Sequence, residues 1–456
     1  MRDLLVFCIV AASIPLTLRR PFIGLLVFTW LAYMRPQNLC WGFAREMRFS
    51  YYVGISMLVA WALVEVGRRN FTRWDVRTVA MGLLAVFVTL SLFQAGSQDP
   101  FVMTRYSEFM KIIVVTLFTV GQVQSRQRLR VILWTIALSL GFFGVKGGIH
   151  GILSGGVVIH RGPGGMLEDN NDFALALVMT LPLLLYLGAA ESIRWLRHAT
   201  TAAVLLCIIT ILLTHSRGGF LALCTVMMVF FWRSRRRYLG LLALLLLLVG
   251  FLNLTPQHVI DRILTIGTYQ TDPSAGARLT SWAVARRMIA DQPFFGVGIR
   301  NFRYEWWRYS GGLVDPGGSF AYVAHNSYLQ IWAESGTFAF LCFTVVLLSS
   351  FWTLRKLRNR ARGVKGAEWV FDYARMFEAS LAGFVVGAIF LNRGHFDLVY
   401  HIFGLITAFN LIALRVFVPG ERRVRGMEES PTLALAGQIS TAVTGFPQTR
   451  LPRWGR

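Results

Sequence analysis

The stretch Ala324-His325-Asn326-Ser327-Tyr328-Leu329-Gln330 closes a polar segment, residues 255–336, around which the rest of the chain is arranged. An apolar run at 238–254 precedes this segment and another at 338–354 follows it. The segment is too rich in glycine, proline and charge to lie in hydrocarbon. Its arginines include Arg278, Arg286, Arg287, Arg300, Arg303 and Arg308. A cationic, aromatic-rich segment held between two apolar runs favours a site for an anionic, partly apolar substrate.

The composition indicates an integral membrane protein. The chain has 456 residues, of which 55% are hydrophobic and only 15% are charged, and its mean hydropathy is +0.53. Soluble domains carry about 25% charged residues. Helices satisfy their own backbone hydrogen bonds in lipid, so we expect an all-α transmembrane bundle. The net charge of +23 is typical of basic cytoplasmic loops, and no nucleic acid is expected as a partner.

Apolar runs along the chain predict about 12 membrane spans. The first two runs are short and are separated by Arg19-Arg20-Pro21, so they are interpreted either as separate spans or as a broken or re-entrant pair. The candidate ranges are 4–18, 22–34, 51–66, 79–93, 109–123, 129–144, 173–190, 201–214, 220–232, 238–254, 338–354, 377–391 and 399–417.

Basic residues predict the orientation, because they gather in every second connection and such loops stay in the cytoplasm. They are Arg68, Arg69, Arg73 and Arg77, then Arg126, Arg128 and Arg130, then Arg194 and Arg197, then Arg233 and Arg235 to Arg237, then Arg355 to Lys365, and finally Arg422, Arg423 and Arg425. Only the first hairpin breaks this register. The connections at 95–105, 145–172, 215–219, 255–336 and 392–398 are then expected outside.

The same pattern divides the chain into four parts. We expect an N-terminal transmembrane bundle at 1–254, the large outer loop at 255–336 and C-terminal transmembrane helices at 337–417. The tail at 418–456 is rich in proline, glycine, threonine and arginine, which predicts disorder.

Two polar groups occupy the expected outer face before the large loop. The first contains Lys146, His150, His160, Arg161 and the run Glu168-Asp169-Asn170-Asn171-Asp172. This run could serve only to cap the helix that follows it. The second is Thr214-His215-Ser216-Arg217-Gly218-Gly219, where Arg217 either extends to the interface or meets a ligand that the two glycines allow to approach.

Two further groups lie in the large loop. One runs from Arg278 and Trp282 to Gly296-Val297-Gly298, which follows no predicted strand and is therefore interpreted as a turn at a helix end. The other is His325-Asn326, where the loop returns to the membrane. A loop histidine is more often structural than catalytic. No metal-ligand spacing stands out, because Asp169 with Asp172 is only a weak candidate and the five cysteines are scattered.

These motifs, in this order, resemble the bacterial O-antigen ligase and polymerase superfamily. The matching pieces are Asn170-Asn171-Asp172-Phe173-Ala174, Ser216-Arg217-Gly218-Gly219, Arg278 with Trp282, Gly296-Val297-Gly298 with Asn301-Phe302, and His325-Asn326-Ser327-Tyr328-Leu329. Arg19-Arg20-Pro21 and Met34-Arg35-Pro36 are similar to the exosortase-associated ligase branch. The resemblance implies a GT-C-like, metal-independent and cofactor-free glycosyltransferase. It would move a glycan from undecaprenyl pyrophosphate to lipid A–core oligosaccharide.

The residue chemistry is compatible with that reaction. Arginine binds phosphate through a planar, bidentate donor fork, so Arg217 and Arg278 are the candidate pyrophosphate ligands, with Arg161 and Lys146 as weaker supporters. Imidazole titrates near neutral pH, so His325 is the candidate general base for the acceptor hydroxyl. Direct attack by that hydroxyl would invert the anomeric carbon.

Several other side chains are candidates for sugar contact or support. They are Asn326, Trp282, Tyr328 and Asp172, and Trp306 and Trp307 could also stack on sugars. An alternative for the aromatic residues is a place at the membrane interface.

Three other functions compete with an inner-membrane ligase whose active site faces the periplasm. An O-antigen polymerase or a protein O-glycosylation ligase would use the same chemistry on a different acceptor. A transporter or flippase of an anionic lipid would explain basic residues in a bundle, although no inverted repeat is visible. The sequence leaves the sugars and the oligomeric state open.

Overall fold

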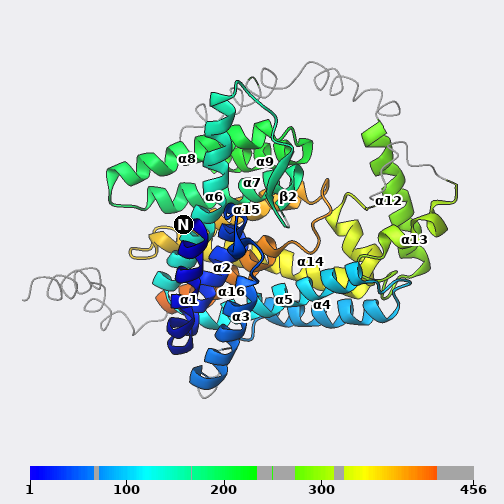
Figure 1. Cartoon of the computed structure of the whole chain (residues 1–456), viewed down its shortest axis with the longest axis horizontal. Coiled ribbons are helices and arrows are strands. Elements are labelled where there is room, and N and C mark those ends of the chain that lie inside the picture. Colours follow the sequence, from blue (N-terminus) through cyan, green and yellow to red (C-terminus); the bar gives the residue numbers. More distant parts are fainter. Residues whose placement is uncertain (66–70, 166, 234–248, 250–272, 313–322, 418–456) are drawn as a thin grey trace, which may run out of the picture. The chain divides into compact units, whose positions relative to one another are not determined.

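The computed structural model describes residues 1–65, 71–165, 167–233, 249, 273–312 and 323–417 (Figure 1). Three sequence predictions fall outside these ranges: most of the apolar run 238–254, the start of the large loop, and the tail after residue 417. The chain divides into two compact units, Met1–Asn410 and Leu411–Arg456. The elements discussed below belong to the first unit, apart from the end of the last helix.

The described residues are mostly helical, as the composition predicts. The helices are α1 Arg2–Arg19, α2 Pro21–Tyr33, α3 Phe49–Ala60, α4 Val76–Phe93, α5 Pro100–Gln122, α6 Arg126–Leu153, α7 Asn170–Ala189, α8 Arg194–Leu213, α9 Arg217–Arg233, α12 Pro273–Asp291, α13 Phe302–Ser310, α14 Ser327–Ala361, α15 Glu368–Gly387 and α16 Asp397–Val416. Short 3-10 turns, η1 Pro36–Leu39 and η2 Phe43–Arg45, and a π-helical turn, η3 Trp61–Glu65, flank α3. Strands β1 Arg161–Gly164 and β2 Leu167–Asp169 form an antiparallel hairpin.

Six described helices, rather than about 12, are long and apolar enough to cross a membrane: α4, α6, α7, α8, α14 and α16. Shorter apolar helices occupy Pro21–Tyr33, Phe49–Val64 and Arg217–Trp232. Every candidate range apart from 238–254 overlaps a described helix, so the difference comes from length and charge. Helix α5 is long enough but carries Arg105, Glu108 and Lys111. The full span count and the GT-C-like arrangement stay predictions.

The first two apolar runs form separate helices. Arg20 between them has extended backbone angles (φ −142°, ψ 95°), and Pro21 opens α2 where its missing N–H costs nothing. Helices α1, α2 and α3 share a buried apolar cluster that includes Val10 and Val53. The carboxylate of Asp3 accepts hydrogen bonds from two backbone amides in the connection between α2 and α3. The beginning of α1 therefore lies beside the end of α2.

Helix α7 forms the centre of the bundle and packs against α6, α8, α9 and α15 (Figure 1). Most of its residues are buried, including Leu175 and Val178. A helix that is apolar around its circumference needs neighbours on all sides. Nearby, Thr210 of α8 donates a hydrogen bond to the carbonyl of Gly144 in α6 over 2.5 Å.

Helix α14 bends sharply at Gly336, which has φ 79° and ψ 177°. The bend leaves two carbonyls of the preceding helical turn without donors from the helix itself. Backbone N–H groups of the Gly296-Val297-Gly298 turn donate to these carbonyls instead. Val297 N–H bonds to Ala333 O and Gly298 N–H bonds to Glu334 O, both at 2.9 Å. The turn follows the end of α12, as the sequence predicts, and its glycine pair also holds the bend in α14.

Candidate functional site

Two polar motifs that lie far apart in the sequence meet at the start of α7. Asp169 caps the helix, because its carboxylate accepts a hydrogen bond from Asn171 N–H at 2.8 Å. Asn170 donates to the carbonyl of Thr214 at 2.8 Å. Ser216 donates to the side-chain oxygen of Asn171 at 2.7 Å. The expected capping role is therefore confirmed for Asp169, while its neighbours bind the turn that carries Arg217.

Arg393 joins this corner to a third motif. Its guanidinium forms an ion pair with Asp172, and both side chains are largely buried. Its backbone N–H donates to the hydroxyl of Ser327 at 2.8 Å. The same hydroxyl donates to Leu391 O at 2.7 Å. Arg393 therefore lies between the start of α7 and the His325-Asn326-Ser327 corner.

His325 lies at a strained corner directly before α14. It is half-buried, and its backbone is left-handed with φ 46°. A left-handed backbone costs free energy for any residue with a Cβ, and such strained residues are concentrated at functional sites. Asn326 caps α14 through its side-chain oxygen, which accepts from Tyr328 N–H at 3.0 Å and Leu329 N–H at 3.1 Å. These contacts fix the direction in which the chain leaves His325.

Other predicted support residues have roles in the fold. The Tyr328 hydroxyl donates to Val385 O at 3.0 Å, so this side chain ties α14 to α15. Trp306 is 1% exposed and lies in an apolar cluster formed by α12, α13 and α14. Its burial leaves no ring face for a sugar. Trp307 on the same helix is 68% exposed.

The predicted pyrophosphate ligands lie at different places in the first unit. Arg217 is the first residue of α9 and is half-buried, beside Ser216. Arg278 is half-buried in α12, one turn before Trp282. Lys146 on α6 and Arg161 at the start of β1 are exposed. The contacts among the described residues bring Arg217 to the Arg393 corner, where Asp172 and Ser327 contact Arg393, and Arg161 pairs with Asp169 in the hairpin directly before that corner. Lys146 has no hydrogen bond or ion pair to this corner among the described residues.

Three groups near this corner, of which one is buried and two are half-buried, were not among the predicted site residues. Besides Arg393, they are Arg300, which follows the Gly296-Val297-Gly298 turn with φ 59°, and His395. Burial lowers the pKa of Arg300, while the Glu334 carboxylate opposes that shift. Burial, aided by the charge of Arg300, holds the pKa of His395 well below its usual value. Arg393 and His395 could have been predicted from the sequence, because Arg393-Gly394-His395 is a polar run in a short connection that was expected on the outer side.

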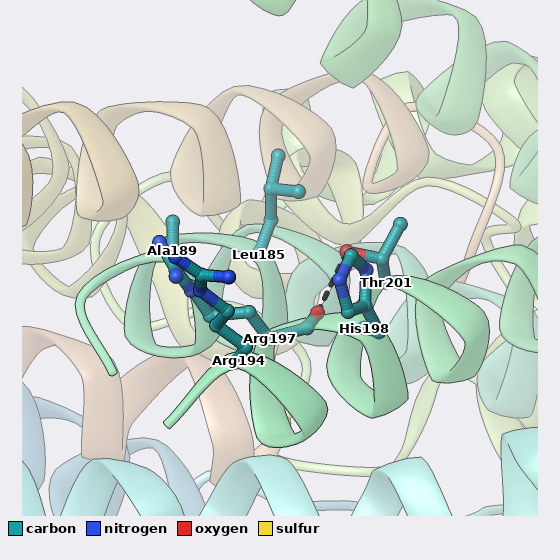
Figure 2. A pocket seen from close by; sticks show the side chains of 6 residues that line it. All are labelled: Leu185, Ala189, Arg194, Arg197, His198 and Thr201. Carbon is teal, nitrogen blue, oxygen red and sulfur yellow. Dashed lines mark hydrogen bonds between the residues drawn. The ribbon is translucent and has the colours of Figure 1, made fainter. Parts of the chain in front are cut away.

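A cavity lies away from these motifs (Figure 2). It has a volume of about 520 Å³ and is lined by Leu185, Ala189, Arg194, Arg197, His198 and Thr201. It therefore lies where α7 ends and α8 begins, at the opposite ends of both helices from Asn170 and Thr214. Thr201 donates to the carbonyl of Arg197 at 2.9 Å, shown as the dashed line in Figure 2.

Metal-ligating side chains do not gather at the Arg393 corner. Within the described ranges, no group of three or more His, Cys, Asp or Glu side chains could hold a metal ion. Asp169 and Asp172, the weak metal candidates, are instead used in a helix cap and an ion pair.

Comparison with protein families agrees with the order of these motifs. Residues 202–344 match the family model described as O-antigen ligase, and residues 1–192 match a family of unknown function. No curated protein matches the chain. The first match contains Arg217, Arg278 and His325, and the apolar helices surround it on both sides. The match over residues 202–344 supports membership of the O-antigen ligase superfamily, and the described apolar helices indicate a multi-pass membrane protein.

Proposed function

We propose that this protein is an O-antigen ligase that transfers a glycan from undecaprenyl pyrophosphate to lipid A–core oligosaccharide. The observation that carries the proposal is the position of Arg393. It contacts both the Asn171-Asp172 corner, which holds the turn of Arg217, and Ser327, two residues after His325. A candidate phosphate ligand and a candidate base are thereby held at the same end of the bundle.

The reaction needs charge stabilisation and a proton acceptor. The acceptor hydroxyl oxygen attacks the anomeric carbon of the donor, and the bond from that carbon to the pyrophosphate oxygen breaks. The lipid pyrophosphate leaves with the electron pair, and His325 takes the hydroxyl proton. Arg217 and Arg278 stabilise the negative charge on the leaving group, and fixed cations are the kind of group that can do so without reorganisation.

Two features support His325 as the base rather than a structural residue. Its backbone is left-handed, and the residues directly after it are fixed by the Asn326 cap and by the Ser327–Arg393 contact. Fixing the backbone next to a catalytic side chain lowers the entropy cost of orienting that side chain toward a substrate. We further infer that Asp172 acts indirectly, by holding Arg393, and not by touching sugar.

We propose that this end of the bundle faces the periplasm of the inner membrane. The basic residues Arg126, Arg194 and Arg355 lie near the opposite helix ends, where α6 and α8 begin and α14 ends. The positive-inside rule assigns that end to the cytoplasm. The lipid-linked donor and the lipid acceptor would then meet on the outer leaflet.

The test uses the purified full chain in detergent with undecaprenyl-pyrophosphate-linked glycan and lipid A–core, with and without EDTA. We expect the glycan to appear on lipid A–core in both conditions, without an energy source. Lengthening of the glycan on its own lipid carrier, with no need for lipid A–core, would identify a polymerase. If the protein does not consume the donor with any acceptor tested, the result would contradict the proposal and favour a transporter.

A further inference from the structure

A second cavity of about 250 Å³ lies between α2, α5 and α16, and the ligands assigned above do not line it. Its polar lining comes from Arg35, Arg105, Lys111 and His401, among others. Gly165 of the β-hairpin turn closes one side. This volume corresponds to roughly eight water molecules. It is below the range of about 300–1,000 Å³ for whole small-molecule sites, so it suits a headgroup rather than an entire lipid.

Within the described part of the chain, two of the cations that line the cavity form no ion pair shorter than 4.0 Å. Arg105 pairs with Glu108 at 2.9 Å. Asp397 also lines the cavity and accepts a hydrogen bond from Leu398 N–H at 2.8 Å. Among the described residues, neither Arg35 nor Lys111 has a carboxylate within 4.0 Å. A lysine in the middle of an apolar helix is costly in a membrane and marks a functional position.

His401 provides an unused hydrogen-bonding atom in the same cavity. Its side chain is 6% exposed, and its Nδ1 lies 3.1 Å from the hydroxyl of Tyr33. Within the described residues, its Nε2 has no hydrogen-bond partner. If the tyrosine hydroxyl donates to Nδ1, then Nε2 carries a hydrogen and can donate to an anion in the cavity. Buried polar atoms of this kind are normally satisfied, so an absent partner is indicated.

Arg35 is held toward the cavity by strained backbone. It has φ 47° directly before Pro36, a position that disfavours helical backbone. Gly165, with φ 61°, packs directly against the Arg35 guanidinium, and a side chain there would displace it. Strain of this kind persists only where surrounding contacts enforce it. The fold therefore fixes this arginine rather than leaving it to move freely in solvent.

The remaining wall of the cavity is apolar. Phe28 and Ala32 line it from α2, and Ile112 and Val115 line it from α5. A free anion would gain nothing from these side chains, whereas the first carbons of a lipid chain would be buried against them.

We infer that this cavity binds the phosphate group of a membrane lipid, with Arg35, Lys111 and His401 Nε2 as donors and the first carbons of the lipid chain against α2 and α5. This binding does not require glycan transfer. Because Arg217, Arg278 and His325 lie elsewhere, the failure of one proposal would leave the other standing.

The test measures equilibrium binding to the purified full chain by native mass spectrometry. The probes are farnesyl phosphate, lipid A, phosphatidylglycerol, the uncharged farnesol and inorganic phosphate. We expect Arg35→Gln and Lys111→Gln each to weaken binding of the phosphorylated lipid by about tenfold or more, the usual loss for one charge-assisted hydrogen bond. His401→Phe, which keeps a ring beside Tyr33, should also weaken it. Arg45→Gln is the matched control, an exposed arginine in the same connection that does not line the cavity.

The outcomes separate the possible ligands. Tight binding of one phosphorylated lipid, lost in the cavity variants and kept in Arg45→Gln, supports the inference and identifies the lipid. Equal binding of farnesol, or binding of inorganic phosphate as tight as that of any lipid, would overturn it. Wild-type affinity in both Arg35→Gln and Lys111→Gln would also overturn it. Thermal unfolding of each variant checks that the protein is folded.

Discussion

Arg393 and Asp172, 221 residues apart in sequence, form an ion pair between the connection that precedes α16 and the first turn of α7. Their side chains are 18% and 7% exposed. Removing one partner of a buried pair leaves an uncompensated charge. We expect Arg393→Ala or Asp172→Ala to lower the free energy of unfolding by about 3–5 kcal/mol. Thermal unfolding in detergent measures this change.

The double variant Arg393→Ala/Asp172→Ala provides the control for that prediction. It should be less destabilised than the sum of the single variants, because neither charge is left alone. Arg308→Ala removes a 67% exposed arginine and should change stability by no more than about 1 kcal/mol. Additive effects at Arg393 and Asp172 would show that the pair does not couple these two segments.

The bend in α14 predicts a sharp difference between two glycines. Gly336→Ala should destabilise the protein by more than about 1 kcal/mol, because φ is 79° and the new Cβ would meet Phe294 O. Gly82→Ala in α4 is the matched change, since nothing lies within 4 Å of its new Cβ. That variant should be neutral or stabilised by up to about 1 kcal/mol. Equal unfolding temperatures for the two variants would contradict the described bend.

Arg217 and Arg278 should each be needed for use of the donor. Alanine at either position removes a charge-assisted contact to pyrophosphate, worth about 1.5–3 kcal/mol. Lysine should restore transfer only in part, because it lacks the bidentate fork. Rates of transfer to lipid A–core by the purified variants test this, with Arg286→Ala, an exposed arginine of α12, as the control. Wild-type rates in both alanine variants would remove these residues from the mechanism.

Variants of His325 separate catalysis from positioning. As a base, His325 should contribute about 10²–10⁴-fold to transfer. His325→Ala should lose this factor while still binding the donor. His325→Gln should be nearly as slow, because an amide hydrogen-bonds but does not take the proton. A fast His325→Gln enzyme would show that the side chain only fixes the corner before Asn326.

His395 should make stability depend on pH. Because burial and Arg300 keep the folded-state pKa well below its usual value, only the unfolded chain takes up this proton below about pH 6.5. The wild type should therefore lose about 1.4 kcal/mol per pH unit relative to His395→Gln as the pH falls further. Unfolding of both proteins between pH 5 and pH 8 measures this difference, with the exposed His198→Gln as the control. Parallel curves for wild type and His395→Gln would exclude this penalty.

Local patterns in the sequence predict the local structure well. The apolar runs within the described residues fall on helices, and Asp169 caps α7. The predicted boundary between the large loop and the next span, at residue 336, coincides with the bend at Gly336. Each of these depends on residues that are close together along the chain. Hydrophobic periodicity and capping chemistry report such features directly.

The long-range arrangement could not be predicted in the same way. Nothing in the spacing of Arg393 identifies Asp172 as its partner, and Arg35, Lys111 and His401 line one cavity from three separate helices or connections. Trp306 illustrates the same limit, because an aromatic residue in a polar loop is equally typical of a sugar site, an interface and a small core. Only packing against α12 and α14 decides among them. The span count stays a prediction, because six of the described helices are long and apolar enough to cross a membrane and the charges on α5 exclude it from that set.

The contact between α4 and the bend of α14 has a consequence for how the chain is made. The hydroxyl of Ser91, at the end of α4, donates to Glu334 O over 2.8 Å, and these residues are 243 positions apart. Ribosomes add about 5–20 residues per second, so α4 is synthesised roughly 10–50 s before its partner. During that interval the newly made helix α4 must contact lipid or the insertion machinery instead of α14. Helix α4 therefore completes this contact only after residue 334 has been synthesised.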